Sequence, residues 1–313
     1  MKDKVKVGLA LALCLIACLV IEYFYKYVFD FVIFLLSILA VKEFAKLQLK
    51  SGMPTYSYCP EVACCLVFLT SFVGFLCGLS AIIILLIVIA VVVAFYLIVF
   101  LGGFLFFSKQ MKDDKFRDVA NMSVKRFAFF KANNTLASIL YPTLMMFFLY
   151  YINHIDYLGL SGLDAKTGDA PMGLFGLVLL FSITVLTDTF AMLFGTWIKG
   201  KKIFPKISPK KTLSGALFGL LGGIIGATIT YIIFGAIFSQ AFFSVHFWQF
   251  IIIGFVGSIV AQAGDLFESF VKRKANVKDA GDFFRSHGGV LDRLDSAIFV
   301  APYVFICLLF LFA

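Results

Sequence analysis

Residues 81–107 read AIIILLIVIAVVVAFYLIVFLGGFLFF and contain no charged side chain. A helix that crosses a bilayer needs roughly 20 consecutive apolar residues, and this run exceeds that length. Of the 313 residues in the chain, 62% are hydrophobic and only 14% are charged, whereas soluble domains contain about a quarter charged residues. Because so few charges could not cover the surface of a soluble core of this size, the sequence predicts an integral membrane protein.

Eight further apolar runs flank this segment, and each is expected to form a membrane helix. They occupy approximately residues 7–24, 27–41, 61–79, 135–152, 172–195, 213–238, 247–268 and 296–313. The predicted fold class is therefore all-α, a polytopic integral membrane protein with about nine transmembrane helices. The sequence shows neither an internal repeat nor a low-complexity linker, which predicts one continuous membrane domain.

The charges between the runs predict how the helices are oriented. Three segments are rich in Lys and Arg, namely 42–50, 108–134 and 196–212, whereas the segment 153–171 has three Asp against a single Lys. Cytoplasmic loops carry an excess of Lys and Arg. One orientation satisfies every segment: the N-terminus and the basic segments are cytoplasmic, and the C-terminus lies outside.

The net charge of +9 comes largely from these basic segments, so we expect no nucleic-acid partner. A basic cytoplasmic face suits anionic lipid headgroups and nucleotides. The lysines before the first run are also typical of a signal peptide, but many spans follow, and a retained first helix is expected. The seven Cys show no metal-binding or disulfide spacing.

The sixth and eighth apolar runs each contain an aspartate, which is costly in a membrane helix unless a function or a partner requires it. In the eighth run, steps of four and three residues place five polar residues on one face of a helix: Ser258, Gln262, Asp265, Ser269 and Lys272. In the sixth run, Thr184 and Asp188 lie four residues apart. Two buried carboxylates, each followed by a basic segment, indicate a metal and phosphate site. A polar contact between helices, or the lining of a transport path, remains open as the alternative.

The segment after the sixth run is basic and irregular. Ser208 lies between two prolines, which fix an irregular backbone, and Lys211 and Thr212 stand at the start of the next helix, where the helix dipole favours an anion. A positive-inside anchor is the alternative for any single lysine here. The next run has glycines at every fourth residue, which predicts close helix packing: Gly215, Gly219 and Gly223, and also Gly222 and Gly226.

The densest group of charges follows the eighth run. Asp292 and Asp295 share one face if the ninth helix begins there, and carboxylate oxygens together with substrate phosphates are the ligands that Mg²⁺ prefers. Gly288 and Gly289 would allow the backbone to approach a phosphate closely. Four cations can neutralise a triphosphate: Lys272, Arg273, Lys278 and Arg293.

At these residues the sequence resembles the phosphatidate cytidylyltransferase (CDP-diacylglycerol synthase) family. The signature of that family is matched by Ser269, Val271, Lys272, Arg273, Lys278, Asp279, Gly281, His287, Gly288, Gly289, Asp292, Arg293 and Asp295. An upstream motif is matched by Thr187-Asp188-Thr189, Phe194-Gly195, Pro205 to Pro209 and Lys211-Thr212. The resemblance is specific from about residue 184 and loose before it, where it includes Glu43. The sequence departs from the family at three places: Arg285-Ser286 for the usual Pro-Gly, Lys210 for a common Gly, and Leu213-Ser214 for a common Trp-Glu.

The resemblance implies that the protein transfers CMP from CTP to phosphatidate, giving CDP-diacylglycerol and pyrophosphate for phospholipid biosynthesis. It implies a multi-pass protein of the cell (plasma) membrane whose active site faces the cytoplasm. On this reading residues 1–134 hold N-terminal transmembrane helices and cytoplasmic loops, and residues 135–313 hold the catalytic transmembrane region. Homodimers are common in that family, although no segment of this sequence marks an interface.

The resemblance also implies roles for individual residues. Asp265 and Asp292 are expected to bind Mg²⁺ in a two-metal site with a second ion of unassigned identity, and Asp295 and Asp188 are the next candidate ligands. Lys272, Arg273 and Lys278 are expected to hold the triphosphate, and His287 either orients a phosphate or shapes a turn. Substrate contacts are expected from Ser208, Lys211, Thr212, Asp188, Arg293 and Ser269.

Two other functions fit parts of the sequence. A CTP-dependent enzyme acting on another lipid, such as a polyprenol kinase or a CDP-archaeol synthase, would differ in the acceptor pocket rather than in the signature. A transporter could use the polar face of the eighth helix as an ion path. It would predict internal repeats or broken helix pairs, and the sequence shows neither.

Overall fold

The computed structural model describes residues 2–105, 122–157, 171–238, 245–284 and 288–312. Apart from one isolated bridge between Lys202 and Thr212, the regular elements of these residues are all helical. They are α1 (Lys2–Phe24), α2 (Lys26–Lys50), α3 (Cys59–Leu76), α4 (Ala81–Leu105), α6 (Val124–Ser138), the π-helix η2 (Ile139–Leu144), α7 (Met145–Asn153), the 3₁₀ turn η3 (Ile155–Tyr157), α9 (Met172–Ile198), α10 (Leu213–Ile237), α11 (Phe247–Lys274) and α12 (Leu291–Phe312).

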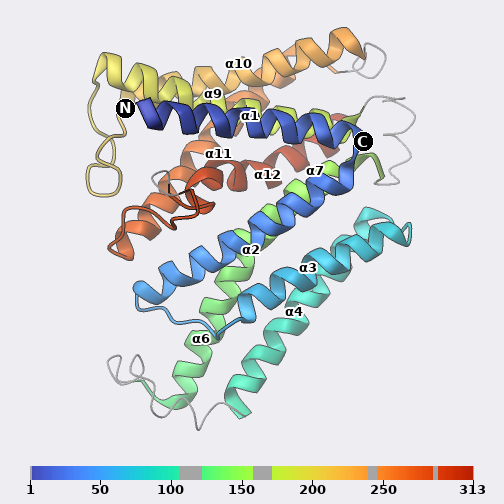
Figure 1. The fold of residues 1–313 in the computed structure, drawn as a ribbon, viewed down its shortest axis with the longest axis vertical. Coiled ribbons are helices and arrows are strands. Elements are labelled where there is room, and N and C mark those ends of the chain that lie inside the picture. The colour runs from blue at the N-terminus through green and yellow to red at the C-terminus, as the bar shows by residue number, and fades with distance from the viewer. Residues whose placement is uncertain (1, 106–121, 158–170, 239–244, 285–287, 313) are drawn as a thin grey trace.

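The helices form a bundle, and the N- and C-termini lie at opposite ends of it (Figure 1). Within the described residues, seven helices are long and apolar enough to cross a membrane: Cys59–Leu76, Ile82–Gly103, Val124–Asn153, Met172–Ile198, Leu213–Ile237, Phe247–Lys274 and Leu291–Leu311. The side chains of α1 are described from Leu13 onward, and Leu13–Phe24 is apolar. Helix α2 is interrupted by charges. Both lie alongside the other helices (Figure 1). The predicted all-α polytopic fold is confirmed, with seven of the nine predicted spans meeting these criteria.

Several helices continue into segments that the sequence assigned to loops. One of these is the segment 42–50, which forms the last turns of α2. Its Lys, Glu, Ala, Leu and Gln residues are good helix formers, so charge alone does not end the helix. The helix ends instead at Ser51 and Gly52, where Gly52 has a φ of 75°. The predicted loop after the eighth run is likewise helical as far as Lys274.

The fifth predicted span consists of two α-helices, α6 and α7, joined by the π-helix η2. Pro142 lacks a backbone N–H and restricts the residue before it, and Tyr141 adopts non-helical dihedrals (φ −133°, ψ 119°). The π-helix η2 therefore joins α6 to α7. The basic segment 108–134 is described only from residue 122, and there it forms the start of α6.

Glycines bring α9, α10 and α11 close together, as their spacing predicts. A Cβ on Gly222 would overlap the carbonyl oxygen of Leu186 on α9, and a Cβ on Gly226 would lie 2.5 Å from the Ser182 carbonyl. On the α11 side, a Cβ on Gly254 would lie 2.5 Å from the Gly223 carbonyl. This packing places the aspartates of α9 and α11 in neighbouring helices.

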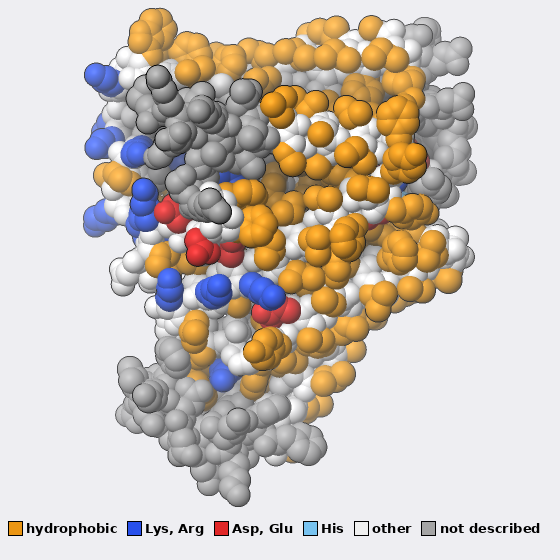
Figure 2. Space-filling model, in the orientation of Figure 1, with side chains coloured by type: hydrophobic (Ala, Val, Ile, Leu, Met, Phe, Trp, Pro, Cys, Tyr) orange, Lys and Arg blue, Asp and Glu red, His pale blue; other side chains and the backbone are white. Residues whose placement is uncertain are grey.

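The charges gather at one end of the bundle. Figure 2 shows Lys and Arg side chains at the end where α9 and α11 terminate, and a broad apolar surface over much of this face. At the opposite end, Asp156 pairs with Lys26 at 2.5 Å and accepts the N–H of Met172 at the start of α9. The other charges of the predicted acidic loop lie outside the described residues. This asymmetry is the one the sequence predicts for a multi-pass membrane protein.

Candidate active site

Three aspartates from three helices lie close together toward the charged end of the bundle. Asp188 lies on α9, Asp265 on α11 and Asp295 on α12, and each carboxylate interacts electrostatically with the other two. Helix α12 can approach here because Gly264 has no side chain: a Cβ would lie 2.7 Å from the Asp295 carbonyl oxygen. Ser296 donates a hydrogen bond of 3.4 Å to Asp188. The fold thus brings together three of the four predicted metal ligands.

A lysine supplies positive charge to this group. Lys211 Nζ lies 3.0 Å from a carboxylate oxygen of Asp265 and 3.4 Å from the Gln262 carbonyl oxygen. Ser269 Oγ donates to the other Asp265 oxygen at 3.4 Å. The side chains of Lys211 and Asp265 keep 25% and 35% of their surface exposed, so an incoming phosphate or cation can reach them.

The remaining positions of the predicted polar stripe contact backbone instead. Ser258 Oγ donates to the Phe255 carbonyl within α11 at 2.7 Å, and Gln262 Nε2 donates to the Ala216 carbonyl of α10 at 3.3 Å. Gln262 therefore makes the polar contact between helices, whereas the Ser258 hydroxyl bonds within its own helix. The polar stripe therefore has two parts. Its mid-helix residues contact backbone, and its residues near the end of α11 belong to the charged site.

The basic segment between α9 and α10 folds back on the start of α10. Thr212 caps that helix, since its Oγ1 accepts the Gly215 N–H at 3.2 Å. Ser208 lies in a turn in which its N–H donates to the Phe204 carbonyl at 2.9 Å. Of the three predicted phosphate contacts in this segment, Lys211 is the one that reaches the aspartates.

Arg273 joins the two basic segments that the sequence described separately. Its Nε donates to the Ile207 carbonyl at 3.1 Å, and its Nη1 donates to the Val277 carbonyl at 3.2 Å. The guanidinium group has five N–H donors, and these two bonds use backbone acceptors on both sides of it. Arg273 therefore holds the loop before α10 against the end of α11.

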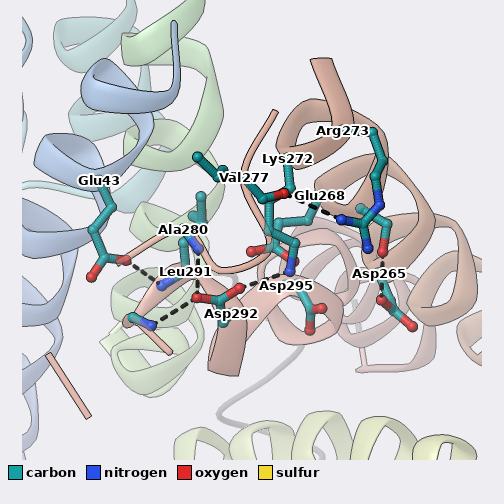
Figure 3. Close-up of polar contacts among 12 residues, drawn as sticks. Glu43, Asp265, Glu268, Lys272, Arg273, Val277, Ala280, Leu291, Asp292 and Asp295 are labelled. Carbon is teal, nitrogen blue, oxygen red and sulfur yellow. Dashed lines mark hydrogen bonds and ion pairs between the residues drawn. The ribbon is translucent and has the colours of Figure 1, made fainter. Parts of the chain in front are cut away.

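Lys272 lies between two buried carboxylates. Its Nζ is 2.6 Å from Glu268 Oε2 and 2.7 Å from Asp292 Oδ1 (Figure 3). The side chains of Lys272, Glu268 and Asp292 are 12%, 0% and 8% exposed. The Lys272 ammonium group was predicted to hold a triphosphate, but in the structure it pairs with Glu268 and Asp292. It thereby links α11 to the first turn of α12.

Asp292 also organises the turn that precedes α12. Its Oδ2 accepts the backbone N–H groups of Gly289 at 2.7 Å and Ala280 at 2.8 Å. Gly288 has a φ of 82°, and a Cβ there would lie 2.6 Å from the same oxygen. The two glycines were predicted to make room for a phosphate, but in the structure the space beside Gly288 holds the Asp292 carboxylate.

Glu43 belongs to this region, although the sequence assigned it no role. From α2, its carboxylate accepts the backbone N–H groups of Val290 at 3.1 Å and Leu291 at 2.8 Å (Figure 3). The residue is 7% exposed. Its only signal in the sequence was a loose family match and the presence of one acid among the lysines of segment 42–50.

The other predicted site residues are exposed or undescribed. Lys278 and Arg293 are exposed near the start of α12. His287 and the departure Arg285-Ser286 lie outside the described residues. The structure therefore leaves the proposed phosphate contact of His287 untested.

The donor chemistry of the site suits a hard cation that a substrate helps to hold. Within the described residues, no group of three His, Cys, Asp or Glu side chains could hold a metal ion alone. Mg²⁺ is commonly bound by one or two carboxylates, with water and substrate phosphates completing the shell. Asp265, with Asp188 and Asp295 beside it, fits that pattern. Asp292 fits it less well, because both of its oxygens already accept bonds from the protein.

These features define the class of protein: a multi-pass α-helical membrane protein with a carboxylate and lysine site at one end of its helices. The model of the Cytidylyltransferase family matches residues 3–311. The chain therefore belongs to the cytidylyltransferase family.

Curated relatives show the same kinship over shorter stretches. The chain is similar to the phosphatidate cytidylyltransferase of Rickettsia prowazekii, with 42% identity over 132 residues, which is 42% of this chain and 57% of the relative. It is 34% identical over 188 residues to the phosphatidate cytidylyltransferase of Staphylococcus saprophyticus, covering 60% of this chain and 63% of the relative. For the Brucella abortus enzyme of the same name, identity is 36% over 152 residues, covering 48% and 53%. The chain thus spans between about half and two thirds of the length of these relatives.

Proposed function

We propose that the protein transfers a cytidylyl group from CTP to phosphatidate, giving CDP-diacylglycerol and pyrophosphate. The observation that carries the proposal is the group of Asp188, Asp265 and Asp295 with Lys211, set between membrane-spanning helices near their charged end. There a lipid can keep its tails in the bilayer while its phosphate meets a nucleotide. The family membership and the names of the curated relatives support this reaction.

The reaction depends on alignment of the two substrates more than on acid–base catalysis. An oxygen of the phosphatidate phosphate forms a bond to the α-phosphorus of CTP, and the bond from that phosphorus to the β-phosphate oxygen breaks. Pyrophosphate leaves with the electron pair. Because the attacking oxygen is already anionic, the barrier lies in charge repulsion and orientation, which fixed cationic groups can lower.

The chain offers cations in positions suited to this task. Lys211 stands beside Asp265 at the entrance of the carboxylate group. The exposed Lys278 lies on the segment that leads into α12, and the exposed Arg293 lies in the first turn of α12. There they would neutralise the phosphates of CTP. Lys272 would act indirectly, by holding Asp292 and the turn before α12 in place.

We further propose that Asp265 holds Mg²⁺ together with substrate phosphates, with Asp188 or Asp295 as a second protein ligand. When bound, a divalent cation would offset the charge of the triphosphate and orient the reacting oxygens. The two-metal arrangement and the ligand role of Asp292 remain predictions. The site would face the cytoplasm at the plasma membrane, because the basic end of the bundle is the end that favours the cytoplasm.

The test supplies the detergent-purified protein with phosphatidate, Mg²⁺ and CTP labelled at either the α- or the γ-phosphorus. The proposal expects label in the lipid from α-labelled CTP alone, with release of pyrophosphate. Label from γ-labelled CTP would instead identify a lipid kinase. If folded protein labels another lipid acceptor but not phosphatidate, the acceptor in the proposal is wrong. Asp265→Asn serves as the matched inactive control.

A further inference from the structure

Glu43 connects the N-terminal part of the chain to the turn that begins α12. Its carboxylate accepts two consecutive backbone N–H groups, those of Val290 and Leu291, at 3.1 and 2.8 Å. These groups lie at the start of the helix, where backbone donors have no partner within the helix and where the helix dipole favours a negative charge. A carboxylate from a distant helix therefore caps α12.

The turn is held from two sides by two carboxylates. Glu43 accepts the N–H groups of residues 290 and 291, while Asp292 accepts those of Ala280 and Gly289. Figure 3 shows Glu43 approaching the turn from α2, with Asp292 facing Ala280 and Lys272. Together the two side chains bind four backbone donors of the segment that leads into the site.

The fit around Glu43 is tight. A Cβ added to Gly281 or to Gly289 would overlap Glu43 Oε1. Neither glycine has a positive φ, so the dihedral angles that require glycine do not explain them. Glycine at both positions instead leaves the space that the Glu43 carboxylate fills. Glu43 is 7% exposed.

We infer that Glu43 is a positioning residue for the reaction: through the turn at 289–291 it sets the placement of Asp292 and Asp295 relative to α11. The kinetic part of this inference rests on the proposed function. Asp295 is one turn further along the same helix, so a shift in the start of α12 moves it relative to Asp265. Misplacement by about 1 Å can cost on the order of 10²-fold in rate.

The kinetic test compares Glu43→Gln with Glu61→Gln, an acid on α3 that lies outside the site. The amide of Gln keeps one acceptor oxygen and presents an N–H₂ group to the other donor, so one backbone N–H loses its partner. We expect Glu43→Gln to lower kcat by about 10-fold or more, with less than about a 2-fold change in the KM for phosphatidate. Equal kcat values for the two variants would overturn the inference.

A second measurement does not depend on activity. Hydrogen exchange of a peptide containing Val290 and Leu291 should be faster in Glu43→Gln than in wild type or Glu61→Gln, because one of the two amides loses its acceptor. Faster exchange in a protein that lacks cytidylyltransferase activity would defeat the proposed function and leave the positioning contact intact. Unchanged exchange would overturn the contact itself.

A double variant separates positioning from general loss of stability. Gly289→Ala alone should lose activity, because its methyl group collides with Glu43. In Glu43→Ala/Gly289→Ala the collision is removed, so the double variant should be no less active than Glu43→Ala. If the two losses multiply, then Glu43 and Gly289 act independently and the inference fails.

Discussion

Lys272 and Asp292 form an ion pair of 2.7 Å that joins the end of α11 to the first turn of α12. Because Asp292 also accepts two backbone N–H groups, this pair connects a helix, a turn and a second helix through one carboxylate. Glu268, fully buried, takes the other side of the ammonium group at 2.6 Å. Lys272 is therefore a structural cation within the family signature, and its loss should lower both stability and activity.

Lys272→Met should destabilise the protein strongly. It leaves Glu268 and Asp292 without their cation in a buried setting, and breaking a buried pair in this way costs about 3–5 kcal/mol. Thermal unfolding in detergent should show a large drop in Tm. Lys274→Met is the control, because Lys274 is exposed at the end of the same helix. Similar Tm values for both variants would contradict the structural role of Lys272.

Asp265→Asn and Asp292→Asn should both abolish turnover, but they should differ in stability. Asp265 lies among mutually repelling carboxylates, and its ion pair with Lys211 is partly exposed and so stabilises little. Removing its charge should therefore change Tm little while turnover falls by more than about 100-fold. Asp292→Asn weakens the bonds to Lys272 and to the turn, so its Tm should fall. Membrane insertion and Tm are measured beside turnover. Near-normal turnover would remove the substituted residue from the catalytic site.

Removal of divalent cations should stop the reaction and lower stability. A ligand that binds only the folded state stabilises it in proportion to the logarithm of its concentration. The Tm of wild type should therefore rise with Mg²⁺ in the presence of CTP, and the Tm of Asp265→Asn should respond much less. Equal responses of the two proteins would place the cation elsewhere.

The sequence predicted the bundle well because the membrane imposes a length on each apolar run. The run at 81–107 corresponds to α4, Ala81–Leu105. Each of the other predicted spans agrees with a helix boundary to within a few residues at one end at least. The polar ends were less predictable. Lys42 to Lys50 continue a helix, because nothing before Gly52 stops one.

The site was predictable where it depended on a single helix and not where it depended on tertiary contacts. Asp188 and Asp265 were identified because an acid in an apolar run is costly, and the structure brings them together. The contact of Glu43 with Leu291 joins residues 248 positions apart, and no local period encodes it. The engagement of Lys272 by two carboxylates depends in the same way on how α12 packs against α11.

The glycines of α10 offer a final prediction, because one of them contacts α9 closely and another does not. A Cβ on Gly222 would overlap the Leu186 carbonyl, whereas a Cβ on Gly235 would meet no described atom within 4 Å. Gly222→Ala should push α10 away from α9, costing about 1–3 kcal/mol. It should lower turnover because Lys211, which directly precedes α10, would shift relative to Asp265. Gly235→Ala should be neutral or slightly stabilising, since Ala favours a helix over Gly by about 1 kcal/mol. Tm and turnover of the two variants, measured side by side, check the prediction, and a tolerated Gly222→Ala would show that close packing of these helices does not set the site.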